Sequence, residues 1–170
     1  MTIFIFLVGG IMFAHLFGLR MFQITTTKLN ATADARKTFA KISDEIRTCH
    51  SASVGNIDNN NFVGLLNGEK QEGAALMIYP TTNSSYVMYF VNPADQTFRR
   101  TVNGTNTSIL AESVTNNAVF IAQSYDGSPL TNSQNNRVIH VTLEFYQAQH
   151  FLRAADYYKL ETSVTRRSLD

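Results

Sequence analysis

The sequence predicts an α+β protein in which a long N-terminal helix packs on an antiparallel β-sheet head. Residues 1–50 contain no proline, and an apolar first third passes into a stretch with helical periodicity. Beyond residue 50 the hydrophobic pattern changes to alternation at every second position, with Asn- and Gly-containing turns between the apolar segments. We therefore expect three parts: an apolar transmembrane or filament-core helix at 1–20, its amphipathic continuation at 21–50, and a β-rich head at 51–170.

The apolar run extends from Ile3 to Leu19, where only His15 interrupts it, and Arg20 ends it. A run of this length is near the minimum that crosses a bilayer core as a helix, and it could equally lie in a bundle of identical helices. His15 is expected to be a neutral side chain near the end of the run. The residues expected to form the assembly surface are Ile3, Phe4, Phe6, Leu7, Val8, Ile11, Phe13, Leu16 and Phe17.

The second part of the helix carries an apolar stripe on one face, while charged residues mostly occupy the other faces. This stripe is expected to attach the helix to the sheet. Small and polar residues follow His50, so the helix is expected to end there. The residues expected to dock on the sheet are Leu29, Phe39, Ile42, Ile46 and Cys49.

The head is expected to consist of short strands separated by turns. Asn67-Gly68 and Asn103-Gly104 are strong turn signals, and Tyr86–Val91 is apolar on both faces, which is typical of a central strand. The last two segments alternate cleanly, as antiparallel strands with one solvated face do. The predicted strands are 62–66, 74–79, 86–91, 97–102, 109–110, 114–123, 138–146 and 157–166.

Composition excludes several classes of protein. Only 16% of the residues are charged and the net charge is +1, so the chain lacks the basic field of a nucleic-acid-binding protein. A single cysteine excludes an internal disulfide. We expect no nucleic-acid partner, and we expect stability to come from ordinary packing and from assembly.

The sequence contains no motif that predicts catalysis, such as a nucleophile elbow, a phosphate-binding loop or a His-Glu-x-x-His helix. His140 and Glu144 share a strand face, but two ligands do not make a metal site. Cys49 lies on the apolar stripe and is expected to be buried and inert, and Asp126 is expected to begin a plain turn. We therefore expect no catalytic, metal-binding or cofactor-binding residues and no enzyme activity.

The chain resembles the type IV pilin and type II secretion pseudopilin superfamily. The stretch Ile3-Phe4-Ile5-Phe6-Leu7-Val8-Gly9-Gly10 is similar to the later part of a prepilin-type N-terminal helix. Ala35-Arg36-Lys37 and Ile42-Ser43-Asp44-Glu45-Ile46-Arg47 resemble the helix of J-like minor pseudopilins, and Leu160 to Arg167 is similar to a last strand common in such proteins. That family has an N-terminal leader and a glutamate, but no leader is present here and no glutamate lies between Met1 and Arg20. Either this start lies inside the family's helix, which we expect, or the chain is a divergent member that lacks the glutamate.

The resemblance implies a structural subunit that polymerises through its N-terminal helix with other pilin or pseudopilin subunits. It also implies a single-pass location in the bacterial inner membrane before assembly, with the head in the periplasm or outside the cell. Two alternatives remain open: a single-pass membrane-anchored domain that binds or senses a ligand outside the cytoplasm, and a secreted β-rich adhesin whose signal peptide is removed. Basic residues after the apolar run, such as Arg20 and Lys28, oppose the expected orientation unless a lost leader carries cytoplasmic positive charge.

Overall fold

The computed structural model describes residues 2–59, 61–81, 85–132, 138–148 and 155–167. Helix α1 spans Thr2–Thr48 and ends two residues before the predicted boundary at His50. The chain divides into two compact units, Met1–Arg36 and Lys37–Asp170. The first unit is therefore helical, whereas the second contains the last turns of α1 and all the described strands.

The first sheet has six antiparallel strands in the order β2-β1-β4-β5-β6-β7. Neighbouring strands along the chain mostly pair with each other, so most of this sheet is a meander. The exception is β1, which lies between β2 and β4. The strand bounds are β1 Ser51–Asp58, β2 Asn61–Gly64, β4 Ala75–Tyr79, β5 Val87–Asn92, β6 Thr97–Val102 and β7 Asn106–Ala111.

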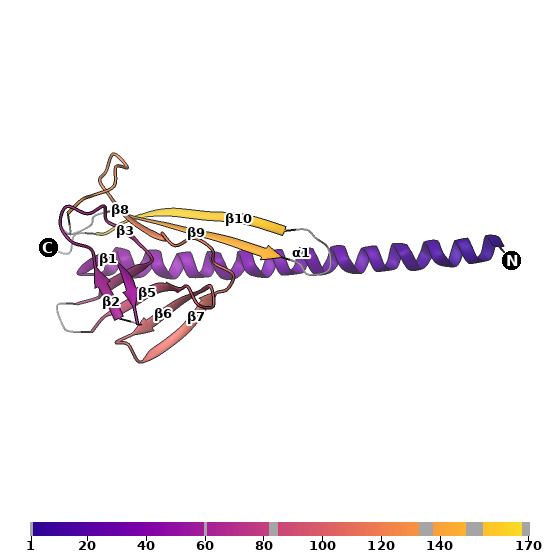
Figure 1. Cartoon of the computed structure of the whole chain (residues 1–170), viewed down its shortest axis with the longest axis horizontal. Helices are drawn as coiled ribbons and strands as arrows, with labels where there is room; N and C mark the ends of the chain where they lie inside the picture. Colours follow the sequence, from indigo (N-terminus) through magenta and orange to yellow (C-terminus); the bar gives the residue numbers. More distant parts are fainter. Residues whose placement is uncertain (1, 60, 82–84, 133–137, 149–154, 168–170) are drawn as a thin grey trace. The chain divides into compact units, whose positions relative to one another are not determined.

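The second sheet has four antiparallel strands in the order β10-β9-β8-β3 (Figure 1). β9 and β10 form a long hairpin that pairs from Ala148↔Ala155 to Val138↔Thr165. The short strand β3 pairs with β8 and closes the other edge. The strand bounds are β3 Glu72–Gly73, β8 Phe120–Gln123, β9 Val138–Ala148 and β10 Ala155–Thr165.

The predicted turn at Asn103-Gly104 is confirmed between β6 and β7. Both residues have positive φ, 51° for Asn103 and 71° for Gly104. Asn and Gly tolerate this left-handed region better than other residues do. The side chain of Asn103 also accepts a hydrogen bond from the backbone N–H of Tyr86 at 2.8 Å, so the turn is tied to the start of β5.

Aromatic residues join the two sheets in one core. The rings of Phe98 on β6 and Phe120 on β8 lie 6.1 Å apart, and Tyr89 on β5 stacks on Phe98 at 6.0 Å. All three side chains are fully buried. From the last turns of α1, Ile42 and Ile46 are also fully buried within this unit.

The opposite face of the first sheet carries a second, smaller cluster. Met88 and Phe90 alternate with Tyr89 along β5, so they point to the other side of the sheet. Ala75 joins them, and partly buried apolar side chains pack around the group. β5 is thus covered on both faces, as its apolar sequence predicts.

The predicted fold class is wrong. The described chain is mostly β, with strands in two antiparallel sheets, rather than α+β with a long N-terminal helix packed on one sheet. Of α1, only Lys37–Thr48 belongs to the unit that contains the sheets. The sequence reasoning missed β1 and β3 because their small, polar and glycine residues lack the alternation that identifies a strand. The described β8 also begins at Phe120, six residues later than the predicted strand at 114–123.

Candidate functional site: an exposed apolar helix surface

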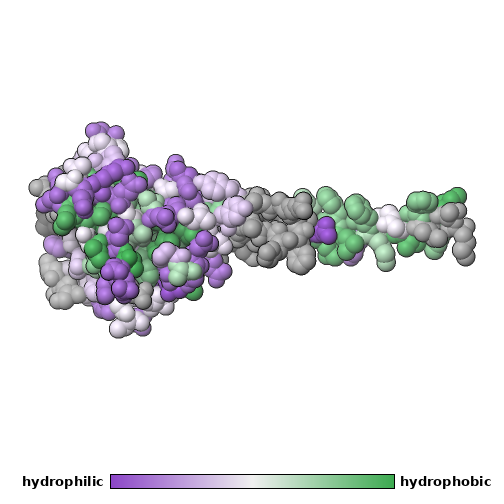
Figure 2. All heavy atoms as spheres, viewed as in Figure 1, coloured by the Kyte–Doolittle hydropathy of each residue, from purple (hydrophilic) through white to green (hydrophobic). Residues whose placement is uncertain are grey.

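The most distinctive surface of the described chain is the N-terminal part of α1. Figure 2 shows hydrophobic residues over much of this part of the helix. The exposed fraction of its large apolar side chains ranges from 38% for Val8 to 83% for Ile3. The exposed residues are Ile3, Phe4, Phe6, Leu7, Val8, Ile11, Met12, Phe13, Leu16, Phe17, Leu19, Met21 and Phe22.

All nine residues predicted to form the assembly surface belong to this exposed set. Monomeric proteins rarely expose contiguous apolar patches of this size, and such patches mark interaction sites. Gly9, Gly10 and Gly18 have no neighbouring atoms within 4 Å of the position of a Cβ, so small residues and large apolar ones share the surface. Its chemistry suits burial against other apolar side chains.

The residues predicted to dock the helix on the sheet are found in several environments. Ile42, Ile46 and Cys49 are buried, and Phe39 is half-buried. The side chain of Leu29 lies outside the part of the chain whose side chains the structure describes. Burial raises the pKa of the Cys49 thiol, and its Sγ donates to the carbonyl of Ile46 at 3.1 Å. Cys49 is therefore a buried, packed side chain, as its place on the apolar stripe predicts.

Sequence reasoning missed a polar cluster that fixes the last turns of α1 to the first sheet. Glu45 accepts a hydrogen bond from the hydroxyl of Tyr89 at 2.8 Å and forms an ion pair with Arg100, whose Nη2 lies 2.7 Å from Oε1. The Arg100 guanidinium carbon lies 5.9 Å from the centroid of the Tyr89 ring. Burial, together with the bond to Glu45, raises the pKa of Tyr89. No pattern in the sequence predicts the ion pair between Glu45 and Arg100, which lie 55 positions apart in the chain.

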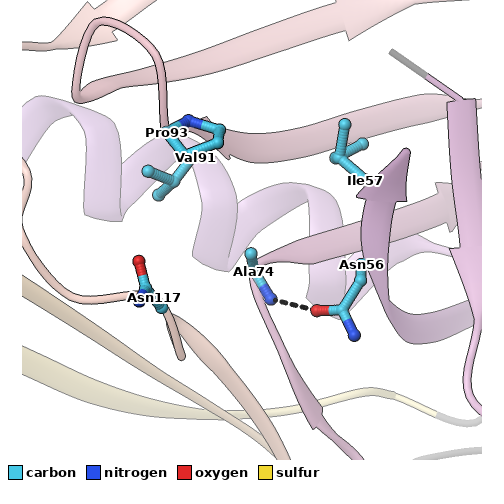
Figure 3. A pocket seen from close by; sticks show the side chains of 6 residues that line it. All are labelled: Asn56, Ile57, Ala74, Val91, Pro93 and Asn117. Atoms are coloured by element: carbon cyan, nitrogen blue, oxygen red, sulfur yellow. Dashed lines mark hydrogen bonds between the residues drawn. The ribbon is translucent and has the colours of Figure 1, made fainter. Parts of the chain in front are cut away.

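A hollow of about 350 Å³ opens beside the first sheet, where β1, β4 and β5 meet (Figure 3). The Asn56 side chain contributes to its wall and accepts a hydrogen bond from the backbone N–H of Ala74 at 3.2 Å. None of the described residues that line it titrates near neutral pH, so it offers no acid–base chemistry. Its lining residues are Asn56, Ile57, Ala74, Val91, Pro93 and Asn117.

The structure also places the other residues that the sequence singles out. His140 Nδ1 lies 2.9 Å from the hydroxyl of Ser163, and the described residues contain no group of three or more metal-ligating side chains. Asp126 begins a turn, in which Oδ1 accepts hydrogen bonds from the backbone N–H of Ser128 at 2.9 Å and its hydroxyl at 2.6 Å. These bonds hold the pKa of Asp126 below its usual value.

The geometry defines a strand-rich head unit together with a helical unit whose apolar side chains are exposed. No known protein-family model, curated protein or solved structure matches this chain.

Among the residues that the structure describes, no helix is long and apolar enough to span a bilayer. This finding contradicts the expected single-pass location in the bacterial inner membrane. The apolar run that starts at Ile3 and ends before Arg20 is at the lower limit of length for a crossing helix, and His15 interrupts it.

Proposed function

We propose that this chain is a structural subunit of a filament related to type IV pili or type II secretion pseudopili. It polymerises through the N-terminal part of α1, with the helices of other pilin or pseudopilin subunits, identical or related, as its partners. The observation that carries the proposal is the exposure of the large apolar side chains between Ile3 and Phe22. The similarity of Ile3–Gly10 to a prepilin-type helix supports it independently.

Energetics favour burial of this surface by sister helices. Burying one Phe, Leu or Ile side chain contributes about 1.5–3 kcal/mol. Association costs about 4–15 kcal/mol in lost translational and rotational freedom, so burial of several of these side chains offsets it. Ile3, Phe6 and Phe13 are each more than 70% exposed and so have most of their area left to bury. Identical copies present the same surface, and a contact that does not close on itself repeats to give a helical filament.

The role proposed is structural rather than catalytic. The head supplies two sheets that fold around their own core, and the helix supplies the contact that repeats. A filament subunit needs no reactive group, and the exposed apolar surface accounts for assembly without one.

A charge introduced into the apolar surface tests the proposal. We expect Val8→Asp and Ile11→Asp to prevent incorporation into filaments, because an unpaired carboxylate buried among apolar helices is costly. Full-length protein purified in detergent is diluted out of detergent, and fibres are measured by pelleting and by negative-stain electron microscopy. The matched control is Val63→Asp, since Val63 is an apolar residue of β2 that is 49% exposed in the head.

The unmodified chain and Val63→Asp are expected to form fibres, whereas Val8→Asp and Ile11→Asp remain unassembled with unchanged circular dichroism of the strands. Fibres of normal yield from Val8→Asp would refute assembly through this helix.

A further inference from the structure

β10 is the edge strand of the second sheet and is long and regular (Figure 1). It spans Ala155–Thr165 and pairs with β9 without any register shift. Within the described residues, no strand lies on its other side. The edge strand β7 differs, since its pairing with β6 is shifted between Phe98 and Arg99. Such bulges discourage edge-to-edge pairing, and β10 lacks this protection.

The faces of β10 restrict how another strand can pair with it. Tyr157, Lys159 and Glu161 point to the exposed face, whereas Val164 is buried on the opposite face. Residues directly opposite each other in an antiparallel pair lie on the same side of the sheet. A second copy of β10 can therefore join only in a register that sets exposed positions against exposed positions, which requires a two-fold axis through a residue of the strand.

Charge selects one of these registers. An axis at Lys159 would set lysine against lysine, and an axis at Glu161 would set glutamate against glutamate. An axis at Leu160 sets Lys159 of each copy against Glu161 of the other, giving two opposite-charge pairs. Leu160 is also the midpoint of β10, so this register pairs the strand over its whole length.

We propose that β10 pairs antiparallel with β10 of a second copy of this chain, about a two-fold axis at Leu160, and so joins two four-stranded sheets into one. The backbone groups along the outer edge of β10 supply the hydrogen bonds. Within one chain Lys159 Nζ forms an ion pair with Glu161 Oε2 at 3.0 Å, and the two side chains remain 46% and 57% exposed, so each has surface left to contact the second copy. This contact closes at two copies and does not use the N-terminal helix, so it is distinct from the filament contact.

Cysteine cross-linking in the full-length chain tests the register. Tyr157 and Ser163 face each other across the proposed axis, at a spacing that a disulfide can bridge. One chain carries Tyr157→Cys and the other carries Ser163→Cys, and the two are mixed and oxidised mildly. We expect a cross-linked dimer from this mixture. Chains with Tyr157→Cys alone should not cross-link to each other, because position 157 does not face itself. The chain's own Cys49 is only 1% exposed, so we expect it not to take part in cross-linking.

Charge swaps on the same cysteine chains test the selectivity. With Glu161→Lys in both chains only lysines face each other, and the yield of dimer should fall roughly tenfold. With Lys159→Glu in one chain and Glu161→Lys in the other, opposite charges face again, and the yield should recover. Both of these chains lack the internal Lys159–Glu161 pair, so recovery cannot come from that pair. Circular dichroism of each variant checks that it is folded.

A normal yield of disulfide in the Tyr157→Cys control overturns the register. No disulfide in the first mixture, or equal yields in all charge combinations, overturns the interface. Since the readout is a bond between two heads, failure here leaves the fibre experiment on α1 unaffected.

Discussion

Glu45 on α1 and Arg100 on β6 form an ion pair with 2.7 Å between Oε1 and Nη2. The two side chains are only 23% and 17% exposed, and Tyr89 donates a further hydrogen bond to the same carboxylate. This contact joins the last turns of α1 to β5 and β6 within the unit Lys37–Asp170.

Removing either partner of this ion pair should destabilise the head. We expect Glu45→Ala or Arg100→Ala to lower the free energy of unfolding by about 1–3 kcal/mol, since the remaining group stays partly buried without its partner. Urea unfolding followed by circular dichroism measures the loss. Lys70→Ala is the control, because the Lys70 side chain is 59% exposed, against 17% for Arg100, and loss of its ion pair with Glu72 should cost below about 1 kcal/mol. Equal losses for Arg100→Ala and Lys70→Ala would contradict the assignment.

Gly73 and Gly55 lie where two strands approach closely. A Cβ on Gly73 would lie 2.1 Å from the carbonyl oxygen of Gly55, and a Cβ on Gly55 would lie 2.4 Å from the carbonyl oxygen of Val63. Backbone atoms cannot move away cheaply, so Gly73→Ala or Gly55→Ala should lower the free energy of unfolding by about 1–3 kcal/mol. Gly64→Ala is the matched control in β2, because its nearest neighbour would be 3.7 Å away. A thermal melt that shifts as far for Gly64→Ala as for Gly73→Ala would exclude the close approach as the cause.

Asn116 connects the segment before β8 to β9 through three hydrogen bonds. Its Nδ2 donates to the carbonyls of Ala118 at 2.9 Å and Thr142 at 2.8 Å, and its Oδ1 accepts from the backbone N–H of Glu144 at 2.9 Å. Asn116→Ala should therefore lower the free energy of unfolding by about 1–3 kcal/mol. The neighbouring Asn117 is exposed, so Asn117→Ala should change it by no more than about 0.5 kcal/mol. Urea titrations of both variants check the difference.

Two buried groups predict a loss of stability in alkali. Burial raises the pKa of Cys49 above its ordinary 9.0, and burial with the bond to Glu45 raises that of Tyr89 above 10.0. The folded state then holds protons that the unfolded chain releases, so the free energy of unfolding is unaffected below about pH 9 and falls as the pH rises beyond that. Urea midpoints between pH 7 and pH 11 measure the slope. Cys49→Ala should reduce the slope that begins near pH 9, and an unchanged slope would contradict burial of the thiol.

Strands whose own sequence alternates were predictable. In β9, Ile139, Val141 and Leu143 alternate with polar residues, and this pattern predicts the strand without knowledge of its partner strands. Strand β1 has no such pattern and was missed, although it joins β2 to β4. β1 is a strand because it pairs with β2 on one side and β4 on the other, and the local sequence does not contain this information.

Much of the candidate surface was predictable for the same reason. An apolar run on a helix is a local property, so Ile3 and Phe13 could be named from the sequence. The cluster of Glu45, Tyr89 and Arg100 could not, because the polar groups come from three separate elements. The partners of a charged side chain depend on how distant elements are brought together.

The amino-acid order alone determined which segments are apolar, which residues alternate, and where Asn103-Gly104 turns the chain, because these are short-range preferences of the backbone and side chains. Only the tertiary structure decided that the strands form two sheets, that Phe98 packs near Phe120 between them, and that Glu45 forms an ion pair with Arg100. Such contacts join residues far apart in the chain, and they form only when the burial they provide outweighs the entropy of closing the intervening loops.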